Sequence, residues 1–172
     1  MCLAIPGQIV EIVDEPNRLH FYVIEKFEQN GVREYQVAVR SLDGDGPHLR
    51  GVDLANGKVG QRASDGWNDC TFDLTNTGRF ARTTAAHPED VNGYLRGDVY
   101  RLSASIAGAG WEAQLYNALA TAKERRDVDV PVFVTRTGSG PSTAVVTLTA
   151  TSESDPSKTD TATCTVNASD LG

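Results

Sequence analysis

The sequence of 172 residues is 40% hydrophobic and 23% charged, and it carries a formal net charge of −7 at pH 7. This length and composition suit one ordinary domain or two small ones with a buried core, and they exclude a globally disordered chain. The negative charge argues against nucleic acid or a membrane surface as a partner, because nucleic acid and anionic lipid both require a cationic face. No apolar run approaches the roughly 20 residues that span a bilayer, and no signal peptide is visible, so a cytoplasmic location is expected.

The first predicted elements in chain order are three β-strands. Residues 8–13 (QIVEIV) are apolar and β-branched, and residues 20–27 (HFYVIEKF) have high β propensity. Residues 32–39 (VREYQVAV) follow an Asn-Gly turn and alternate apolar with polar side chains. The chain then becomes polar, rich in glycine and weakly patterned, which predicts a first β region over residues 1–55 and a linker over 56–65.

Residues 66–168 are predicted to form a second all-β region. Its strands are short and lie between turn signals at regular spacing: WNDCTFDL, DVYRLSASI, GWEAQLY, VDVPVFVTR, STAVVTLTATS and DTATCTVNA. About seven such strands are typical of a β-sandwich. A helix is the alternative over residues 113–126, which are rich in Ala and Leu. Trp67 and Trp111 are expected in the core of the sandwich, or alternatively in a platform that stacks on sugars.

Cys2 is unusual by position, because only the initiator Met1 precedes it. Removal of that methionine leaves a free amine and a thiol on one residue, and part of such a thiol is thiolate at neutral pH. A thiolate at a chain end, just before a strand that sets its direction, suits iron or another thiophilic metal. The alternative is a small, half-buried apolar residue at a frayed terminus.

The residues around Cys2 resemble the opening signature of the hydrogenase-maturation chaperones (the HypC/HupF family). In that family the run is Met-Cys, an aliphatic, a small residue, an aliphatic, Pro, any residue, a basic residue or Gln, and an aliphatic. The run MCLAIPGQI satisfies every position, and VDEPNRL, GVREYQVAV and LDGDGP extend the likeness to residues 1–47. The family's later His-Val-Gly-Phe-Ala strand has no counterpart here.

This resemblance implies a small β-barrel-like accessory protein. Cys2 would be the metal ligand that holds an iron–cyanide–carbonyl unit together with a maturase partner. The unit would then pass to the hydrogenase large subunit. Pro6 and Gly7 would shape the turn that presents Cys2 and would take part in partner binding.

The second region resembles a different class of protein, the immunoglobulin-like stalk domains appended to secreted bacterial hydrolases. The likeness rests on an opening strand closed by Asn-Thr-Gly, a Gly-Trp after the central strand, and a final hairpin rich in Thr, Val and Ser. It implies an Ig-like β-sandwich over residues 66–168 that acts as a non-catalytic structural or interaction module. The whole chain is therefore expected to be all-β.

Two further cysteines, Cys70 and Cys164, lie in the first and last strands of this second region. In many sandwiches those edge strands are side by side, so a disulfide between them is geometrically plausible. Such a bond would constrain the unfolded chain by about 4 kcal/mol. The alternative is two unrelated buried thiols, which the lack of an export signal favours.

The three histidines fall in separate segments without an i, i+4 partner, and no phosphate-binding glycine motif or nucleophile elbow is present. The protein is therefore not expected to be an enzyme. The position-specific motif at Cys2 favours a cytoplasmic metallochaperone for nickel–iron hydrogenase assembly. The alternative is an Ig-like module of an exported bacterial protein, secreted after removal of an export signal.

Overall fold

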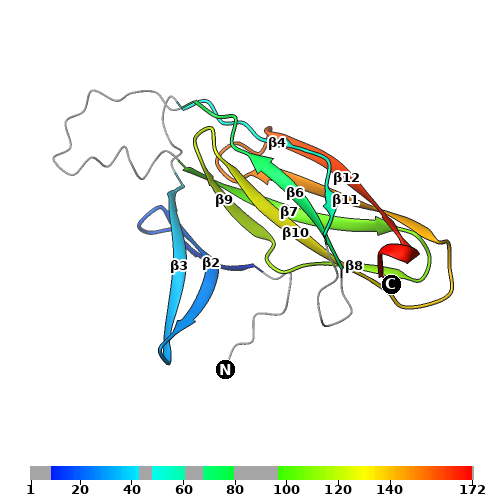
Figure 1. Ribbon diagram of the computed structural model, residues 1–172. Coiled ribbons are helices and arrows are strands. Elements are labelled where there is room, and N and C mark those ends of the chain that lie inside the picture. Colours follow the sequence, from blue (N-terminus) through cyan, green and yellow to red (C-terminus); the bar gives the residue numbers. More distant parts are fainter. Residues whose placement is uncertain (1–8, 43–47, 61–67, 80–96, 172) are drawn as a thin grey trace.

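The protein is described from a computed structural model that covers residues 9–42, 48–60, 68–79 and 97–171. Over these ranges the chain is all-β, which confirms the predicted fold class. Its strands form three antiparallel sheets, and the short 3₁₀ helix η2 (Ala168–Leu171) follows the last strand (Figure 1). Among the described residues, no helix has the length and hydrophobicity that crossing a membrane requires.

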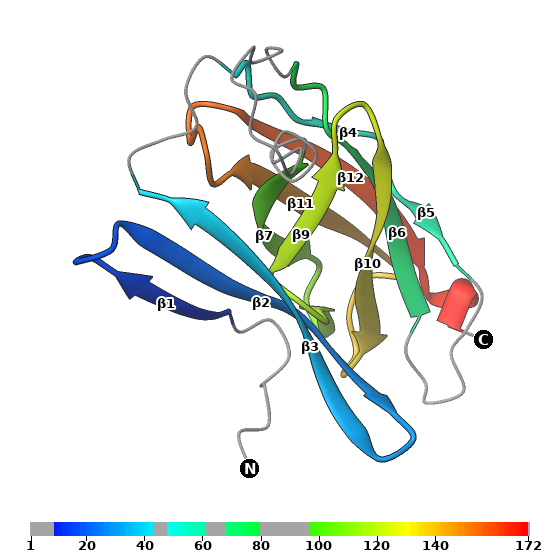
Figure 2. The ribbon, with the colours of Figure 1, turned by 90° about the vertical axis from the view of Figure 1, so that its left-hand side faces the viewer.

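The N-terminal sheet contains three strands in chain order: β1 (Val10–Asp14), β2 (Leu19–Gln29) and β3 (Val32–Ser41). Strands β2 and β3 are joined by the predicted Asn-Gly turn. Asn30 and Gly31 have φ angles of 53° and 76°, and positive φ at both central residues is what a two-residue type I′ hairpin turn requires. The resulting sheet is twisted and lies against one side of the remaining strands (Figure 2).

The other two sheets face each other as a sandwich. The first has the strand order β4-β6-β10-β8, and β5 also pairs with β6. Its strands are β4 (Asp53–Leu54), β5 (Lys58–Val59), β6 (Asn68–Thr75), β8 (Trp111–Leu115) and β10 (Asp127–Arg136). The second has the order β12-β11-β7-β9. Its strands are β7 (Gly97–Ala107), β9 (Leu119–Lys123), β11 (Thr143–Ser152) and β12 (Thr159–Asn167).

The core between these two sheets follows from period-two alternation. Strand β6 buries every second residue from Asn68 to Leu74, and β11 does the same from Ala144 to Ser152. Alternate side chains of a strand point to opposite faces, so each sheet presents one apolar face to the other. Trp111 is buried, as predicted, and its indole N–H donates to the Pro141 carbonyl at 3.0 Å. Trp67 lies outside the described residues.

The helix alternative over residues 113–126 is wrong, because this segment contains the end of β8 and the whole of β9. Leu115, Leu119, Ala120 and Ala122 are all buried there. Ala and Leu favour a helix in isolation, but that preference is weak and burial between two sheets overrides it.

Cys70 in β6 and Cys164 in β12 form a disulfide, with their Cα atoms 6.2 Å apart and a sequence separation of 94. The two strands do not lie side by side in one sheet. They belong to opposing sheets, so the bond crosses the core, where both cysteines are buried.

The segment from β4 to β5 also connects the two sheets. Strands β4 and β5 pair with β6 in the first sheet. From the same segment, the Leu54 N–H donates to the Asp160 carboxylate at 2.7 Å and the Gly57 N–H donates to the Thr163 carbonyl at 3.0 Å, both on the second sheet. Residues 53–60 therefore cover the side of the sandwich on which the disulfide lies.

Candidate functional site: the junction between the N-terminal sheet and the sandwich

The N-terminal sheet meets the sandwich through one face of β2. His20, Tyr22 and Ile24 alternate along this strand and are all buried. Tyr22 and Ile24 pack with Val99 of β7 and Leu119 of β9 in a small apolar cluster. The opposite face of the sheet is exposed, with Val10, Ile12, Val37 and Val39 between 47% and 64% accessible to solvent.

One end of the junction is a polar cluster, here called the clasp, formed by Glu11, His20, Tyr22, Arg101 and Glu153. The Tyr22 hydroxyl donates to Glu153 Oε2 at 2.8 Å, and its oxygen lies 2.9 Å from His20 Nδ1. The other ring nitrogen of His20 lies 2.9 Å from Glu11 Oε2. Arg101 donates to Glu153 Oε1 at 2.5 Å and to Glu11 Oε2 at 2.9 Å, which closes the ring of contacts.

The geometry of the clasp sets the position of one proton. Tyr22 has a single hydroxyl proton, and that proton is directed to Glu153. The two ring nitrogens of His20 lie within hydrogen-bond distance of the phenol oxygen and of the Glu11 carboxylate, respectively. The ring of His20 therefore connects Glu11 of β1 with Tyr22 of β2.

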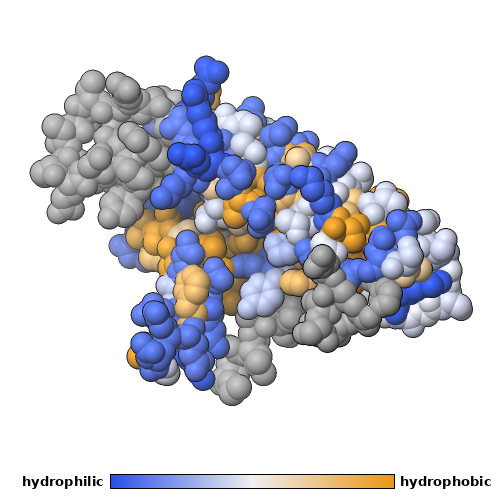
Figure 3. Space-filling view, in the orientation of Figure 1, coloured by the Kyte–Doolittle hydropathy of each residue, from blue (hydrophilic) through white to orange (hydrophobic). Residues whose placement is uncertain are grey.

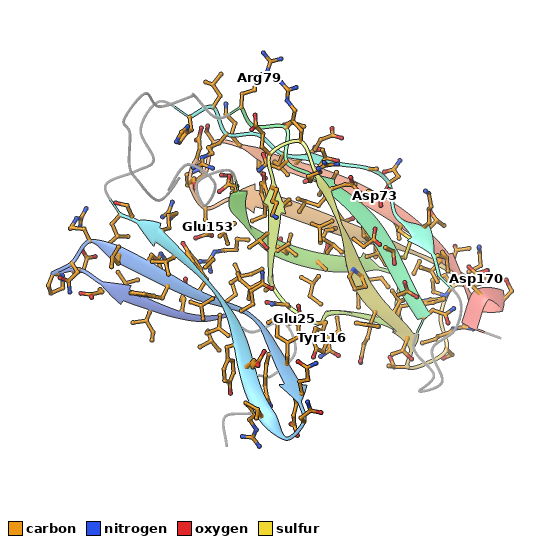
Figure 4. All side chains as sticks on the ribbon, turned by 60° about the vertical axis from the view of Figure 1, so that its left-hand side comes forward. Glu25, Asp73, Arg79, Tyr116, Glu153 and Asp170 are labelled. Carbon is orange, nitrogen blue, oxygen red and sulfur yellow. A yellow bond between two sulfur atoms is a disulfide. The ribbon has the colours of Figure 1, made fainter. Side chains whose placement is uncertain are left out.

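The charges of the other members are set by burial and by each other. Burial raises the pKa of Glu153, but hydrogen bonds from Arg101 and Tyr22 outweigh it and hold the pKa below its ordinary value. A hydrogen bond from Arg101 likewise lowers the pKa of Glu11. Burial and the neighbouring Glu153 raise the pKa of the Tyr22 hydroxyl, so it remains a donor. The clasp holds fixed charges near neutral pH, which suits attachment of one sheet to another (Figure 4, near Glu153).

The other end of the junction is a cleft of about 320 Å³, here called the junction cleft. Its lining comes from β2 and β3 on one side and from β7, β9, β10 and the β8–β9 turn on the other. The lining residues are Ile24, Glu25, Gln36, Leu102, Tyr116, Asn117, Leu119, Ala120, Thr121, Val128, Asp129, Val130 and Pro131. In the space-filling view, hydrophobic surface gathers where the N-terminal sheet meets the sandwich (Figure 3).

The junction cleft exists because the ladder between β8 and β10 stops early. Its last pair is Leu115 with Val132. The next residue along β10 is Pro131, which has no N–H to donate, and from Tyr116 onward the chain leaves this sheet for β9 in the other. Residues 127–131 of β10 therefore pair only with β6, and β9 lies near their second edge without pairing with it.

The rim of the junction cleft is acidic and carries an exposed aromatic ring. Tyr116 is 68% exposed, and Figure 4 shows it beside Glu25 at the mouth. Asp129 is exposed on β10 and stands directly opposite Asp73 of β6. The lining residues include no Lys, Arg or His, so the cleft presents an apolar floor with negative charge around it.

The site residues predicted from sequence lie elsewhere. Cys2, Pro6 and Gly7 are outside the described residues. Cys70 and Cys164 are brought together in the disulfide rather than in a reactive site. The sequence reasoning missed His20 because it looked for an i, i+4 partner, which is a helical spacing. The signal was the strand spacing of His20 and Tyr22, which places both side chains on one face.

Comparisons with known proteins identify relatives of the region that forms the sandwich. Residues 53–168 match the family model described as "Peptidase M6-like domain". A protein of Arthroderma benhamiae named "Putative secreted metallopeptidase" is 46% identical over 124 residues, which cover 68% of this chain and 18% of that protein. The chain thus spans less than a fifth of the relative's length. No solved structure matches the chain.

These findings overturn the functional prediction made from the N-terminal motif. The metallochaperone function, the maturase partner and the hydrogenase large subunit are wrong, because the long match is to a peptidase-related family. The resemblance at Cys2 rests on about a dozen residues, whereas the family match follows the sandwich from β4 to the start of η2. The iron–cyanide–carbonyl unit has no support.

Two further expectations change with the family. The expectation that the protein is not an enzyme is corrected, since the family and the relative both take their names from peptidases. The cytoplasmic location is not supported either, because the relative is named as a secreted protein. The alternative of an exported β-sandwich module agrees better with both findings.

The relative's name implies a metal, which needs a cluster of ligating side chains. Within residues 9–42, 48–60, 68–79 and 97–171, no group of three or more His, Cys, Asp or Glu side chains is placed to hold a metal ion. In the clasp, both nitrogens of His20 are already hydrogen-bonded to Tyr22 and Glu11. These residues do not fit a peptidase metal centre. With residues 53–168 matched over more than half of its length, the chain belongs to the Peptidase M6-like domain family.

Proposed function

We propose that this chain is the β-sandwich module of a secreted metallopeptidase and that it binds polypeptide for that enzyme. The observation that carries the proposal is the 46% identity to the relative named as a secreted metallopeptidase, together with the family match over residues 53–168. In this proposal the peptidase metal is held by a part of the longer protein outside the residues described here.

One structural feature and one comparison support a secreted module. The Cys70–Cys164 disulfide crosses the core, and disulfides of this kind persist in oxidising compartments outside the cytoplasm. The chain also corresponds to only 18% of the relative, which is the size relation of a module to a multidomain protein.

The proposal also changes the division of the chain. The sequence predicted a sandwich from residue 66, after a linker over 56–65. We place the start of the module at β4 (Asp53–Leu54), because β4 and β5 pair with β6 and the family match begins at residue 53. The N-terminal sheet is then an attachment that the clasp holds against the module.

The test uses the natural protein, recovered from a culture of the organism that produces it. Antibodies against the chain should recover, from the culture medium, a protein longer than 172 residues. The immunopurified protein should cleave an unfolded substrate such as reduced casein and lose this activity with a metal chelator. Recovery only from inside cells, or purified protein without chelator-sensitive cleavage, would contradict the proposal.

A further inference from the structure

We propose that the junction cleft binds an extended polypeptide segment in which apolar and basic side chains alternate, and that this segment adds as a strand to the unpaired edge of β10. The inference rests on the proposed function for the identity of the occupant, a stretch of protein substrate. Four features of the cleft favour binding: an unpaired strand edge, an apolar floor, acidic charge and an exposed tyrosine.

The first feature is the unpaired edge. Residues 127–131 of β10 pair with β6 on one side only. At about 3.3 Å per residue, this edge extends over roughly 16 Å, enough for about five residues of an added strand. An unpaired strand edge offers a row of backbone donors and acceptors to another extended chain. The main chain of the incoming segment would supply the missing hydrogen bonds.

The second feature is the floor beneath that edge. Leu102, Leu119 and Val130 are buried residues of the sandwich that line the cleft. A strand laid along β10 would direct every second side chain toward this floor and the intervening side chains toward solvent. The segment therefore needs apolar residues at alternate positions.

The third feature is the negative charge that the solvent-facing side chains of the bound segment would lie beside. Glu25 and Asp129 lie at the rim, and no ion pair among the described residues involves either carboxylate. Asp129 also stands directly opposite Asp73, an arrangement of like charges that costs stability in a free sheet. A basic side chain over this pair would relieve the repulsion. A second copy of the chain is disfavoured as occupant, because each copy carries a net charge of −7.

The fourth feature is Tyr116, which is 68% exposed at the mouth beside Glu25 (Figure 4). Tyrosine offers a large rigid surface and a polar tip, and it is over-represented among residues that dominate binding energy. Tyr116 would close over the bound segment from the side opposite β10.

The test uses the full chain and a fluorescently labelled eight-residue peptide that alternates Val and Lys, followed by fluorescence anisotropy. Three comparison peptides separate the contributions: alternating Val and Glu, alternating Gly and Lys, and the Val–Lys peptide with alternate backbone nitrogens methylated. The Val–Lys peptide should bind with saturation and about tenfold or more tighter than each comparison peptide, because each comparison lacks the basic charge, the apolar side chains or the backbone donors.

Variants then locate the binding. Asp129→Lys and Tyr116→Ala should each weaken binding by about tenfold. The matched controls Glu112→Lys, on exposed β8 surface outside the cleft, and Tyr35→Ala, an exposed tyrosine of β3, should change it by less than about twofold. All four substituted side chains are exposed or on the surface, and thermal unfolding of each variant checks that it folds.

Hydrogen exchange supplies a readout that does not depend on variants. Peptide binding should slow exchange of the amides in residues 127–130 of wild-type protein. The inference is overturned by absence of saturable binding, by equal binding of the Val–Glu or Gly–Lys peptide, or by binding that survives both cleft variants. These results leave the secretion and cleavage assays unaffected, so failure of the inference and failure of the proposed function can be told apart.

Discussion

At the scale of single residues, Tyr22 belongs to both the apolar and the polar part of the junction. Its ring belongs to the apolar cluster with Ile24, and its hydroxyl contacts Glu153 and His20. Tyr22 and Glu153 are 131 residues apart in sequence. The clasp therefore exists only when the N-terminal sheet is folded against the sandwich.

Tyr22→Phe should lower the free energy of unfolding by about 1–2 kcal/mol, because the carboxylate of Glu153 and the ring of His20 each lose a buried partner. Urea denaturation at pH 7 measures the change. The matched control Tyr116→Phe removes an exposed hydroxyl and should change the stability by less than about 0.5 kcal/mol. Equal stability of Tyr22→Phe and the wild type would show that the Tyr22 hydroxyl contributes nothing.

The carboxylates of the clasp predict how stability depends on pH. Glu11 and Glu153 have folded-state pKa values below their ordinary value of 4.5. A group of this kind stabilises the fold fully above its unfolded pKa, and the stabilisation is lost as the pH falls through the folded pKa. The thermal midpoint should therefore decline from about pH 5 downward.

Glu153→Gln tests the assignment of this decline. The variant should be less stable than the wild type at pH 7, and the difference should shrink as the pH falls toward 3. Glu112→Gln, at an exposed position of β8, is the control and should follow the wild-type curve. A constant difference between Glu153→Gln and the wild type at all pH values would contradict the charge argument.

At the scale of elements, the sandwich is joined on one side by the disulfide and by the segment from β4 to β5. The disulfide connects β6 to β12 across the core. Directly beside it, Gly57 passes so close that an added Cβ would lie 2.8 Å from the Cβ of Cys164 and 3.0 Å from the ring of Phe72. Only glycine allows the backbone this approach.

Replacing Cys70 and Cys164 together by alanine should lower the free energy of unfolding by about 4 kcal/mol, since the bond constrains a loop of more than 90 residues in the unfolded chain. Denaturant unfolding with and without reductant measures this change, and reductant should affect only the wild type. Denatured, unreduced protein should also titrate one thiol, from Cys2. Three free thiols would contradict the disulfide.

Gly57→Ala should destabilise the protein by about 1–3 kcal/mol, because the new methyl group overlaps Cys164 and Phe72 in a packed region. Gly97→Ala is the matched control: the nearest atom to its added Cβ is the Ala122 carbonyl oxygen at 3.7 Å, an ordinary contact. Thermal unfolding of both variants makes the comparison. Equal midpoints would show that the segment can move away from β12.

At the scale of the whole molecule, the N-terminal sheet and the sandwich differ in how many apolar side chains each buries. The sandwich buries a continuous apolar core from both sheets, whereas the N-terminal sheet contributes Tyr22, Ile24 and the partly buried Ala38 to a small cluster shared with β7 and β9. The clasp and this small cluster hold the sheet in place. Ile24 and Leu119 of this cluster also line the junction cleft.

This difference predicts unequal local stability. Amides of β2 and β3 should exchange with solvent faster than amides of β6, β10 and β11, because opening the junction exposes little apolar surface. Hydrogen exchange followed by mass spectrometry measures the order. The Tyr22→Phe variant should accelerate β2 and β3 further while leaving β11 unchanged, and uniform acceleration would indicate a single cooperative unit.

Much of the fold was predictable because the residue patterns of strands and turns depend on neighbours along the sequence. Alternation in residues 32–39 and the Asn30–Gly31 turn predicted a hairpin that the structure contains. The helix alternative over 113–126 was wrong because composition does not reveal that two sheets would bury those residues. The function was misassigned for a related reason: a motif of a dozen residues at Cys2 was weighed above the architecture of the longer region.

The amino-acid sequence by itself determined the all-β class, the positions of most strands and the turn chemistry between them, because each depends on neighbours along the chain. Tertiary structure alone decided which strands face each other. It also brought Cys70 and Cys164 together in a disulfide and placed the Tyr22 hydroxyl within hydrogen-bond distance of Glu153. Tertiary structure further decided that β10 keeps an unpaired edge above an apolar floor. Such sites join residues that are distant in sequence, and only the packing of complete sheets brings them within reach of one another.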